Sequence, residues 1–200
     1  MIDDEITTII MGGGKGTRLG TPKIYYQFRG KPLWSIMYDK FIEHTANTII
    51  IGLDTDPKST RNASLLEVLK TVKTKKVLVV DITVPLLTDI SIQRLLSLSR
   101  HSKSATLGYF LNESVYNSYT KTYDSTNDAF KVEPIQLFDT DLLLSVLLDT
   151  PNENFKEYTE VIYKQTNCAP KIVEVSPLET YKLITKDDAR IIDNLIKANR

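Results

Sequence analysis

Apolar residues along the first half of the chain follow two alternating patterns. Short unbroken runs rich in β-branched residues, such as ITTIIM at 6–11, are typical of buried β-strands. Between them, apolar residues recur at helical spacing behind residues that favour helix starts, such as Pro32 and Thr88. The patterns predict strands at 6–11, 48–53 and 76–80 and helices at 32–42, 63–72 and 88–98. Because strands alternate with helices, we expect βαβ units and a mostly parallel sheet.

The second half of the chain has less regular patterning. Residues 114–132 are rich in Tyr, Thr, Ser and Asn, which suits an extended hairpin or arm better than a core element. Asp139 or Thr140 is a candidate N-cap for one helix, and Thr185 is a candidate for the last helix. The remaining patterns predict strands at 105–110, 171–175 and 181–184 and helices at 139–148, 155–165 and 186–198.

The length of the chain, 200 residues and 22.7 kDa, suits one domain with a substantial core. Its composition, 42% hydrophobic and 25% charged, is that of a soluble globular protein. We find no internal repeat and no obvious linker, so we expect a single domain over residues 1–200. The predicted fold class is α/β: a Rossmann-like three-layer domain with a mostly parallel central sheet and a protruding β-arm at about 112–133.

The net charge and the small numbers of cysteines and histidines exclude several classes of binding partner and metal site. Lys+Arg and Asp+Glu both total 25, and this balance excludes a strong overall basic field for nucleic acid or anionic membranes. The single Cys168 excludes an internal disulfide, and two histidines, His44 and His101, exclude the usual zinc ligand sets. The first residues are acidic where a signal peptide is basic, and no run approaches the roughly 20 apolar residues of a membrane span. We therefore expect a cytoplasmic protein without nucleic acid or membrane partners.

Five of the eight glycines lie at 12–20, directly after the first predicted strand. A glycine-rich loop at this edge of an α/β sheet brings backbone N–H groups close to a phosphate. It is not a Walker loop, since Gly16 separates Lys15 from Thr17. It is not a dinucleotide fingerprint either, because Thr21-Pro22 keeps the chain out of a helix.

Three cations, Lys15, Arg18 and Lys23, accompany these glycines. Fixed positive charge among exposed N–H groups suits a triphosphate, and it suits a reaction in which pyrophosphate leaves. The loop therefore predicts a binding site for a nucleoside triphosphate.

The segment GGKGTRLG at 13–20, followed by Pro22-Lys23, Tyr25 and Gly30-Lys31-Pro32-Leu33, resembles the opening motif of nucleotide-sugar-type nucleotidyltransferases. Four later segments resemble landmarks of the cytidylyltransferases of methylerythritol phosphate and ribitol phosphate. They are RNASL at 61–65, VDITVP at 80–85, PIQLF at 134–138 and TYKLIT at 180–185. The five landmarks follow the family's order and cover nearly the whole chain.

The resemblance implies a Mg²⁺-dependent cytidylyltransferase that moves CMP from CTP to a small phosphorylated alcohol, such as ribitol phosphate or methylerythritol phosphate, and releases pyrophosphate. Arg18, Lys23 and Lys182 are then the catalytic residues, and Asp81 is the Mg²⁺ ligand. The residues that bind CTP are Gly12, Gly13, Gly14, Lys15, Gly16, Thr17, Arg61 and Ser64. The resemblance also implies a homodimer in which the arm is exchanged between subunits, and tyrosines on the arm suit an interface.

The chain departs from the family pattern mainly on the acceptor side. Val84 stands where the family has an arginine, and Ser59-Thr60 stands where it has Gly-Gly. Thr126 aligns with an acceptor-binding arginine of the methylerythritol enzymes. Two alternatives therefore stay open. One is a nucleotidyltransferase with another base or a sugar-phosphate acceptor, and the other is a catalytically impaired homologue that acts as a binding partner.

Overall fold

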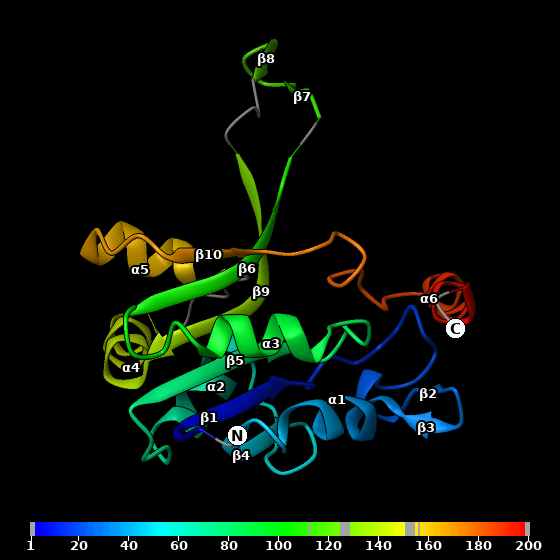
Figure 1. Cartoon of the computed structure of the whole chain (residues 1–200), viewed down its shortest axis with the longest axis horizontal. Helices are drawn as coiled ribbons and strands as arrows, with labels where there is room; N and C mark the ends of the chain where they lie inside the picture. Colours follow the sequence, from blue (N-terminus) through cyan, green and yellow to red (C-terminus); the bar gives the residue numbers. More distant parts are fainter. Residues whose placement is uncertain (1–2, 112, 125–128, 151–154, 156, 199–200) are drawn as a thin grey trace.

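The computed structural model describes residues 3–111, 113–124, 129–150, 155 and 157–198. At its centre is a six-stranded sheet with the strand order β10-β6-β9-β5-β1-β4 (Figure 1). The strands are β1 (Asp3–Met11), β4 (Thr45–Ile51), β5 (Lys76–Asp81), β6 (Ser104–Phe110), β9 (Phe130–Asp139) and β10 (Lys171–Glu174). Only β9 runs against its neighbours β5 and β6, so the prediction of a mostly parallel sheet is confirmed.

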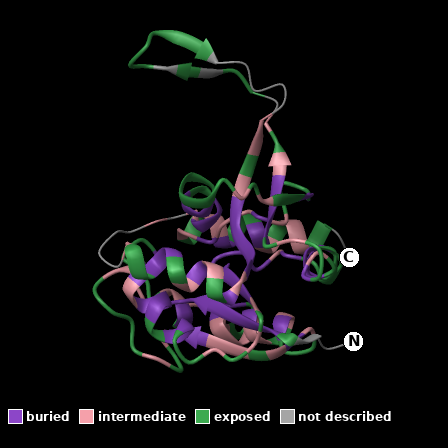
Figure 2. Ribbon diagram, turned by 90° about the vertical axis from the view of Figure 1, so that its left-hand side faces the viewer, coloured by how far each residue is buried: buried purple, intermediate pink, exposed green. Residues whose placement is uncertain are grey.

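Helices cover both faces of this sheet (Figure 1). On one face, α1 (Leu33–Phe41), α3 (Asp89–Leu96) and α6 (Lys186–Ala198) pack on Ile10, Leu78 and Val80. On the other face, α2 (Arg61–Leu69), α4 (Thr140–Asp149) and α5 (Tyr158–Thr166) pack on Ile9, Val77 and Val79. Successive residues of β1 and β5 thus serve opposite cores, as the two-residue period of a strand requires. The predicted three-layer α/β fold is confirmed, and Figure 2 shows both buried layers in purple.

The remaining elements are short. The connection from β1 to α1 contains the 3-10 helix η1 (Lys23–Tyr25) and the small antiparallel pair β2 (Gln27–Phe28) and β3 (Lys31–Pro32). A second antiparallel pair, β7 (Val115–Asn117) and β8 (Thr122–Asp124), stands away from the body of the molecule (Figure 1). The predicted protruding arm is therefore confirmed, although residues 112 and 125–128 of the predicted segment lie outside the described residues. None of the described helices is long and apolar enough to cross a membrane.

Capping side chains account for two of the predicted helix starts. The Thr88 hydroxyl accepts a hydrogen bond from the N–H of Ser91 at the start of α3, and the Thr185 hydroxyl accepts one from the N–H of Asp188 at the start of α6. Asp139 stands before α4 without a capping hydrogen bond, because its carboxylate pairs with Lys76.

Two predictions in the second half need correction. The segment 181–184 is not a strand: it runs without regular secondary structure, and its Leu183 N–H donates to the Thr83 carbonyl oxygen at 2.7 Å. The predicted helix at 155–165 corresponds to α5, which begins at Tyr158; residue 156 lies outside the described residues. Strand β9 was not predicted as such, although it lies inside the sheet between β5 and β6.

The position of β9 explains why its pattern is irregular. Pro134 has no N–H to donate to a neighbouring strand, and the β6–β9 register shifts between Thr106 and Gly108. The Thr106 hydroxyl lies within 3.0 Å of the Glu133 carbonyl oxygen at this irregularity. At the base of the arm, β9 is thus an irregular strand. It pairs with β5 on one side and, with a shifted register, with β6 on the other.

Candidate active site

A cleft of about 310 Å³ opens at the carboxyl ends of three parallel strands. Met11, Ile51 and Asp81 are the last residues of β1, β4 and β5, and the register places them side by side. The cleft is lined by Met11, Gly13, Gly14, Lys23, Ile51, Pro57, Lys58, Ser59, Thr60, Arg61, Ser64, Asp81 and Phe155. This edge of an α/β sheet is where such folds bind ligands, and the sequence predicted the site there.

Two glycines of the loop are required by the backbone path. The Gly12 N–H donates to the Ile51 carbonyl oxygen at 3.0 Å, and a Cβ at Gly12 would lie 2.4 Å from the Ile24 side chain. Gly16 has φ +62°, and a Cβ there would lie 1.8 Å from the Thr21 carbonyl oxygen. These two glycines shape the loop, whereas the exposed Gly13 and Gly14 line the cleft.

The three predicted cations of the loop occupy different places. Lys23, half-buried at the start of η1, lines the cleft. Its N–H lies 3.5 Å from the Gly14 carbonyl oxygen, so η1 closes back on the loop. Lys15, Thr17 and Arg18 are exposed on the same loop but do not line the cleft. The structure therefore brings Lys23 together with the other predicted residues that line the cleft. The other two cations, Lys15 and Arg18, are not among the lining residues.

The N-terminus of α2 forms the opposite wall. The Thr60 hydroxyl accepts from the Ala63 N–H at 3.0 Å and caps the helix. The Ser64 hydroxyl donates to the Thr60 carbonyl oxygen at 2.8 Å and accepts from the Lys58 N–H at 2.9 Å. Ser64 thereby fixes the segment that precedes the helix, and its role as a contact for cytosine stays a prediction.

Asp81 lies between two polar neighbours at the floor of the cleft. One carboxylate oxygen accepts from the N–H and the hydroxyl of Thr83, at 3.0 and 2.8 Å. The other faces an Arg61 guanidinium nitrogen at 3.5 Å. The guanidinium also lies 5.9 Å from the centre of the Tyr158 ring, and its buried Nε has no hydrogen-bond partner among the described residues. Arg61 and Asp81 are thus held in the cleft as a pair.

A divalent cation fits this carboxylate only if other ligands complete its shell. Among the residues that the structure describes, no group of three His, Cys, Asp or Glu side chains could hold a metal ion. Mg²⁺ in nucleotide sites commonly takes one or two carboxylates and completes its octahedral shell with phosphate oxygens and waters. Asp81, with one oxygen fixed by Thr83 and the other facing the cleft, suits that kind of site.

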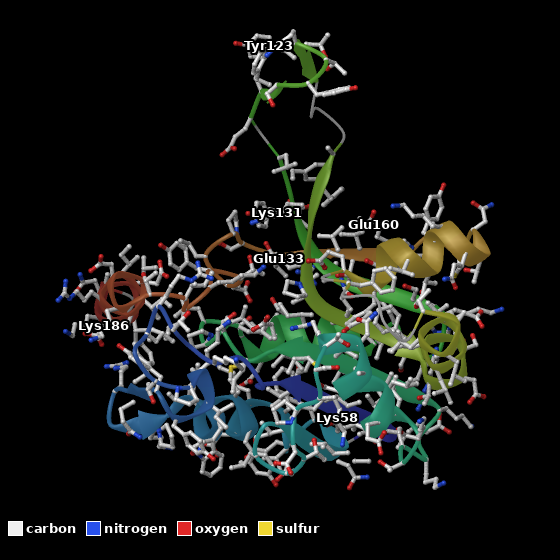
Figure 3. All side chains as sticks on the ribbon, turned by 180° about the vertical axis from the view of Figure 1, so that it is seen from behind. Lys58, Tyr123, Lys131, Glu133, Glu160 and Lys186 are labelled. Carbon is white, nitrogen blue, oxygen red and sulfur yellow. The ribbon has the colours of Figure 1, made fainter. Side chains whose placement is uncertain are left out.

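Lys182 lies apart from the residues that line the cleft. Its ammonium group pairs at 3.2 Å with Glu133, a carboxylate on β9 that is 1% exposed. Lys131 pairs with the other oxygen of the same carboxylate at 3.1 Å. Figure 3 shows Glu133 and Lys131 on β9 at the base of the arm. Neither was predicted as a site residue, because their meeting with Lys182 depends on how β9 lies in the sheet.

A second acidic residue, Glu157, lies near this cluster. Burial raises the pKa of its carboxyl from 4.5 to about 7, and the neighbouring Glu133 adds to this; Lys182 and Arg61 act in the opposite direction. The Gln136 amide donates to Glu157 at 2.6 Å and accepts from the Tyr158 N–H at 3.0 Å. The sequence singled out the segment around Gln136 by resemblance, but gave no signal for Glu157.

Replacing Glu157 with glutamine is expected to flatten the pH dependence of stability. The folded state holds the Glu157 proton up to about pH 7 and the unfolded state only to 4.5, so the native free energy of unfolding falls as pH rises through that window. Allowing for the partial exposure of the carboxyl, we expect a loss of about 1–2 kcal/mol in the parent. Urea unfolding of parent and Glu157→Gln at both ends of the window measures this. Equal slopes in the two proteins would contradict it.

Val84 and Thr126 are two of the three departures from the family pattern. Val84 is fully buried in the core beside α3, so this position offers no contact to a substrate. Thr126 lies outside the described residues. The structure places two other cations, Lys131 and Lys182, around Glu133 at the base of the arm.

Comparison with protein families identifies the family of this chain. Residues 8–143 match the MobA-like NTP transferase domain, which is more than half of the chain. The chain belongs to the MobA-like NTP transferase family. The matched segment of this NTP transferase begins in β1 and includes the glycine loop, α2 and Asp81.

Individual relatives agree with the resemblance found in the sequence. The NTP transferase is 24% identical over 220 residues to the bifunctional enzyme IspD/IspF of a Nitratiruptor species. The alignment includes 96% of this chain and 55% of that protein, so the chain spans about half the length of the curated relative.

Solved structures show the same fold. The 4-diphosphocytidyl-2C-methyl-D-erythritol synthase of Anaerococcus prevotii superposes with a TM-score of 0.80 at 16% identity, covering 97% of this chain and 99% of that one. The 2-C-methyl-D-erythritol 4-phosphate cytidylyltransferase of Thermus thermophilus gives a TM-score of 0.76 at 16% identity, with coverages of 95% and 98%. These likenesses confirm the predicted Rossmann-like fold, and the family match confirms the predicted nucleotidyltransferase family.

Proposed function

We propose that this NTP transferase moves CMP from CTP to a small phosphorylated alcohol, which gives a CDP-alcohol and pyrophosphate. The observation that carries the proposal is the cleft, which Lys23 of η1 lines together with Gly13 and Gly14 of the loop, Arg61 and Ser64 of α2, and Asp81. Exposed glycine N–H groups and a cation suit phosphates on one wall, and the polar start of α2 suits a base on the other. The family match and the solved relatives support the same chemistry.

The reaction needs positive charge before two anions meet. An oxygen of the acceptor phosphate attacks the α-phosphorus of CTP, a new P–O bond forms, and the bond to the pyrophosphate oxygen breaks. Lys23 stabilises the charge that develops on the α-phosphate, while Lys15 and Arg18 neutralise the departing pyrophosphate. Lys182 attracts the acceptor phosphate. The glycines of the loop and Thr17 hold the triphosphate, and Arg61 and Ser64 hold the nucleoside.

Asp81 would hold a Mg²⁺ ion, which supplies further charge neutralisation to the triphosphate when it is bound. Thr83 keeps one oxygen of this carboxylate oriented, so the other oxygen is the one available to a cation. Arg61 pairs with that oxygen at 3.5 Å, so a bound cation would take the place of this pair.

The assembly and location of the protein belong to the same proposal. The arm presents Tyr116, Tyr119 and Tyr123 to solvent, with Tyr119 94% exposed, and aromatic side chains are enriched in interfaces. We propose a homodimer formed through this arm, a single domain over residues 1–200, and a cytoplasmic location.

Pyrophosphate release tests the function. The purified protein is incubated with each of the four nucleoside triphosphates, with ribitol phosphate, methylerythritol phosphate or a hexose phosphate, and with or without Mg²⁺. We expect release only with CTP, a polyol phosphate and Mg²⁺. Release with another nucleotide would favour the alternative transferase. Silence with every pair, together with no thermal shift on CTP addition, would favour an impaired homologue.

A further inference from the structure

Glu133 is an unusual residue for its place in the sheet. It lies on β9 at the base of the arm, and its carboxylate is 1% exposed (Figure 3). Both carboxylate oxygens are buried without a hydrogen-bond partner among the described residues, although two ammonium groups approach them at ion-pair distance. A buried charge is costly unless it is paired, so these two lysines are what makes Glu133 tolerable.

The first of the two lysines is held by more than the carboxylate. The Lys131 ammonium group donates to the Tyr109 hydroxyl at 2.8 Å and lies 5.1 Å from the centre of the Tyr109 ring. Burial acts to lower the pKa of Lys131, but the hydrogen bond to Tyr109 and the negative charge of Glu133 outweigh it and raise that pKa. Lys131 therefore stays positively charged at neutral pH, in a fixed position.

The second lysine connects the cluster to the cleft. Lys182 precedes Leu183, whose N–H donates to the Thr83 carbonyl oxygen at 2.7 Å. The Thr83 hydroxyl in turn donates to Asp81 at 2.8 Å, at the floor of the cleft. A short chain of hydrogen bonds thus joins the backbone beside Lys182 to the carboxylate of the candidate active site.

The carboxylate and the two lysines differ in exposure. Glu133 is enclosed, whereas the side chains of Lys131 and Lys182 are 50% and 31% exposed. The buried acid therefore gathers two cations that repel each other and leaves both open to solvent. Glu133 supplies one negative charge against two ammonium groups, and Glu157, whose pKa burial raises to about 7, is only partly ionised at neutral pH. The cluster therefore keeps a net positive charge that suits a phosphate monoester.

We propose that Glu133 is a positioning residue that holds Lys131 beside Lys182, and that the two lysines together bind the phosphate of the acceptor. This inference rests on the proposed cytidylyl transfer, and it adds Lys131 as a direct contact of the acceptor. The inference also supplies a replacement for the arginine that the family has at position 84. Val84 is buried in the core and offers no cation to the acceptor phosphate, whereas Lys131 does.

Steady-state kinetics with CTP and ribitol phosphate or methylerythritol phosphate test the two residues. Lys131→Met is expected to raise KM for the acceptor about tenfold and leave KM for CTP within about twofold, since one charge-assisted contact is lost. Lys131→Arg should restore part of the loss. Lys103→Met, at an exposed lysine before β6, is the matched control and should change neither constant. An unchanged acceptor KM in Lys131→Met would overturn the proposal.

The Glu133→Gln variant distinguishes a carboxylate that positions the two lysines from one that only cancels their charge. If the carboxylate positions the lysines, its loss raises the acceptor KM, in the same direction as Lys131→Met. If it only cancels their charge, its loss lowers the acceptor KM, and that result would overturn the positioning role. Circular dichroism of each variant establishes that the fold is kept, and Lys131→Met, a change at a half-exposed side chain, tests the site independently of Glu133.

Binding of inorganic phosphate tests the site without catalysis. Calorimetric titration of the parent in the presence of CTP, which occupies the loop, should show phosphate binding that weakens about tenfold in Lys131→Met. Such weakening supports the phosphate site formed by Lys131 and Lys182 even if the protein releases no pyrophosphate. In that case only the proposed function is contradicted. Turnover with CTP together with equal phosphate affinity in parent and variant would instead sink the inference and leave the proposed function standing.

Discussion

Lys23→Ala is expected to lower kcat for cytidylyl transfer by about 10²–10³-fold, the usual cost of removing one preorganised donor from a charged transition state. Lys23 lines the cleft from the start of η1, next to the exposed Gly14. Its loss removes a positive charge from the part of the cleft that Gly13 and Gly14 line, and it creates no cavity in the hydrophobic core. The free energy of unfolding should therefore stay within about 0.5 kcal/mol of the parent. Pyrophosphate release at saturating CTP and acceptor, with urea unfolding alongside, measures both quantities.

Lys31→Ala is the matched control for this variant. Lys31 lies a few residues further along the same connection, where its exposed ammonium group pairs with Asp39 at 3.1 Å. An exposed ion pair contributes little to stability, so this variant should keep both kcat and stability. Equal kcat in Lys23→Ala and the parent would remove Lys23 from the mechanism. Equal losses in the two variants would show a general effect of charge on this surface.

The predictable part of the fold was encoded locally. Strands β1 and β5 contain β-branched and aliphatic runs, at 6–11 and 77–80, that are buried on both faces. That composition is visible without any knowledge of neighbours. The starts of α3 and α6 carry threonine caps whose hydrogen bonds lie within three residues. The place of Asp81 at the sheet edge has the same local origin, since this residue directly follows the run at 77–80.

The parts that were missed depend on distant neighbours. Strand β9 carries Pro134 and a register shift, and only its partners β5 and β6 make it a strand. The segment 181–184 has the composition of a strand, but its Leu183 bonds to a loop at Thr83 and finds no strand to pair with among the described residues. Tertiary context overrides β-propensity in both cases.

The two halves of the candidate site use different chemistry, and this decides how far the sequence could describe each. The proposed nucleotide half takes its glycines and cations from one short loop, so a local motif was sufficient to predict it. The proposed acceptor half takes its side chains from β9 and the segment before α6, gathered around Glu133. No single motif contains that set, and the pKa of Glu157 likewise follows from burial, which a sequence does not state.

Gly16→Ala is expected to raise the Kd for CTP by about 30- to 150-fold, equivalent to about 2–3 kcal/mol. The backbone at Gly16 has φ +62°, and an added Cβ would lie 1.8 Å from the Thr21 carbonyl oxygen and 2.9 Å from the Lys23 backbone nitrogen. Both obstacles are backbone atoms, so no side chain can move aside. The loop must change its path and carry Lys23 away from the cleft. Calorimetric titration of CTP into parent and variant measures the change.

Gly20→Ala separates this steric effect from backbone strain. Gly20 also has a positive φ, +81°, but no atom lies within 4 Å of a Cβ built there. Alanine at this position therefore carries only the conformational cost, and we expect about 1 kcal/mol lower stability with little change in the Kd for CTP. A Gly16→Ala protein that binds CTP as tightly as Gly20→Ala does would show that the loop tolerates another path. The glycine at position 16 would then serve the fold and not the nucleotide.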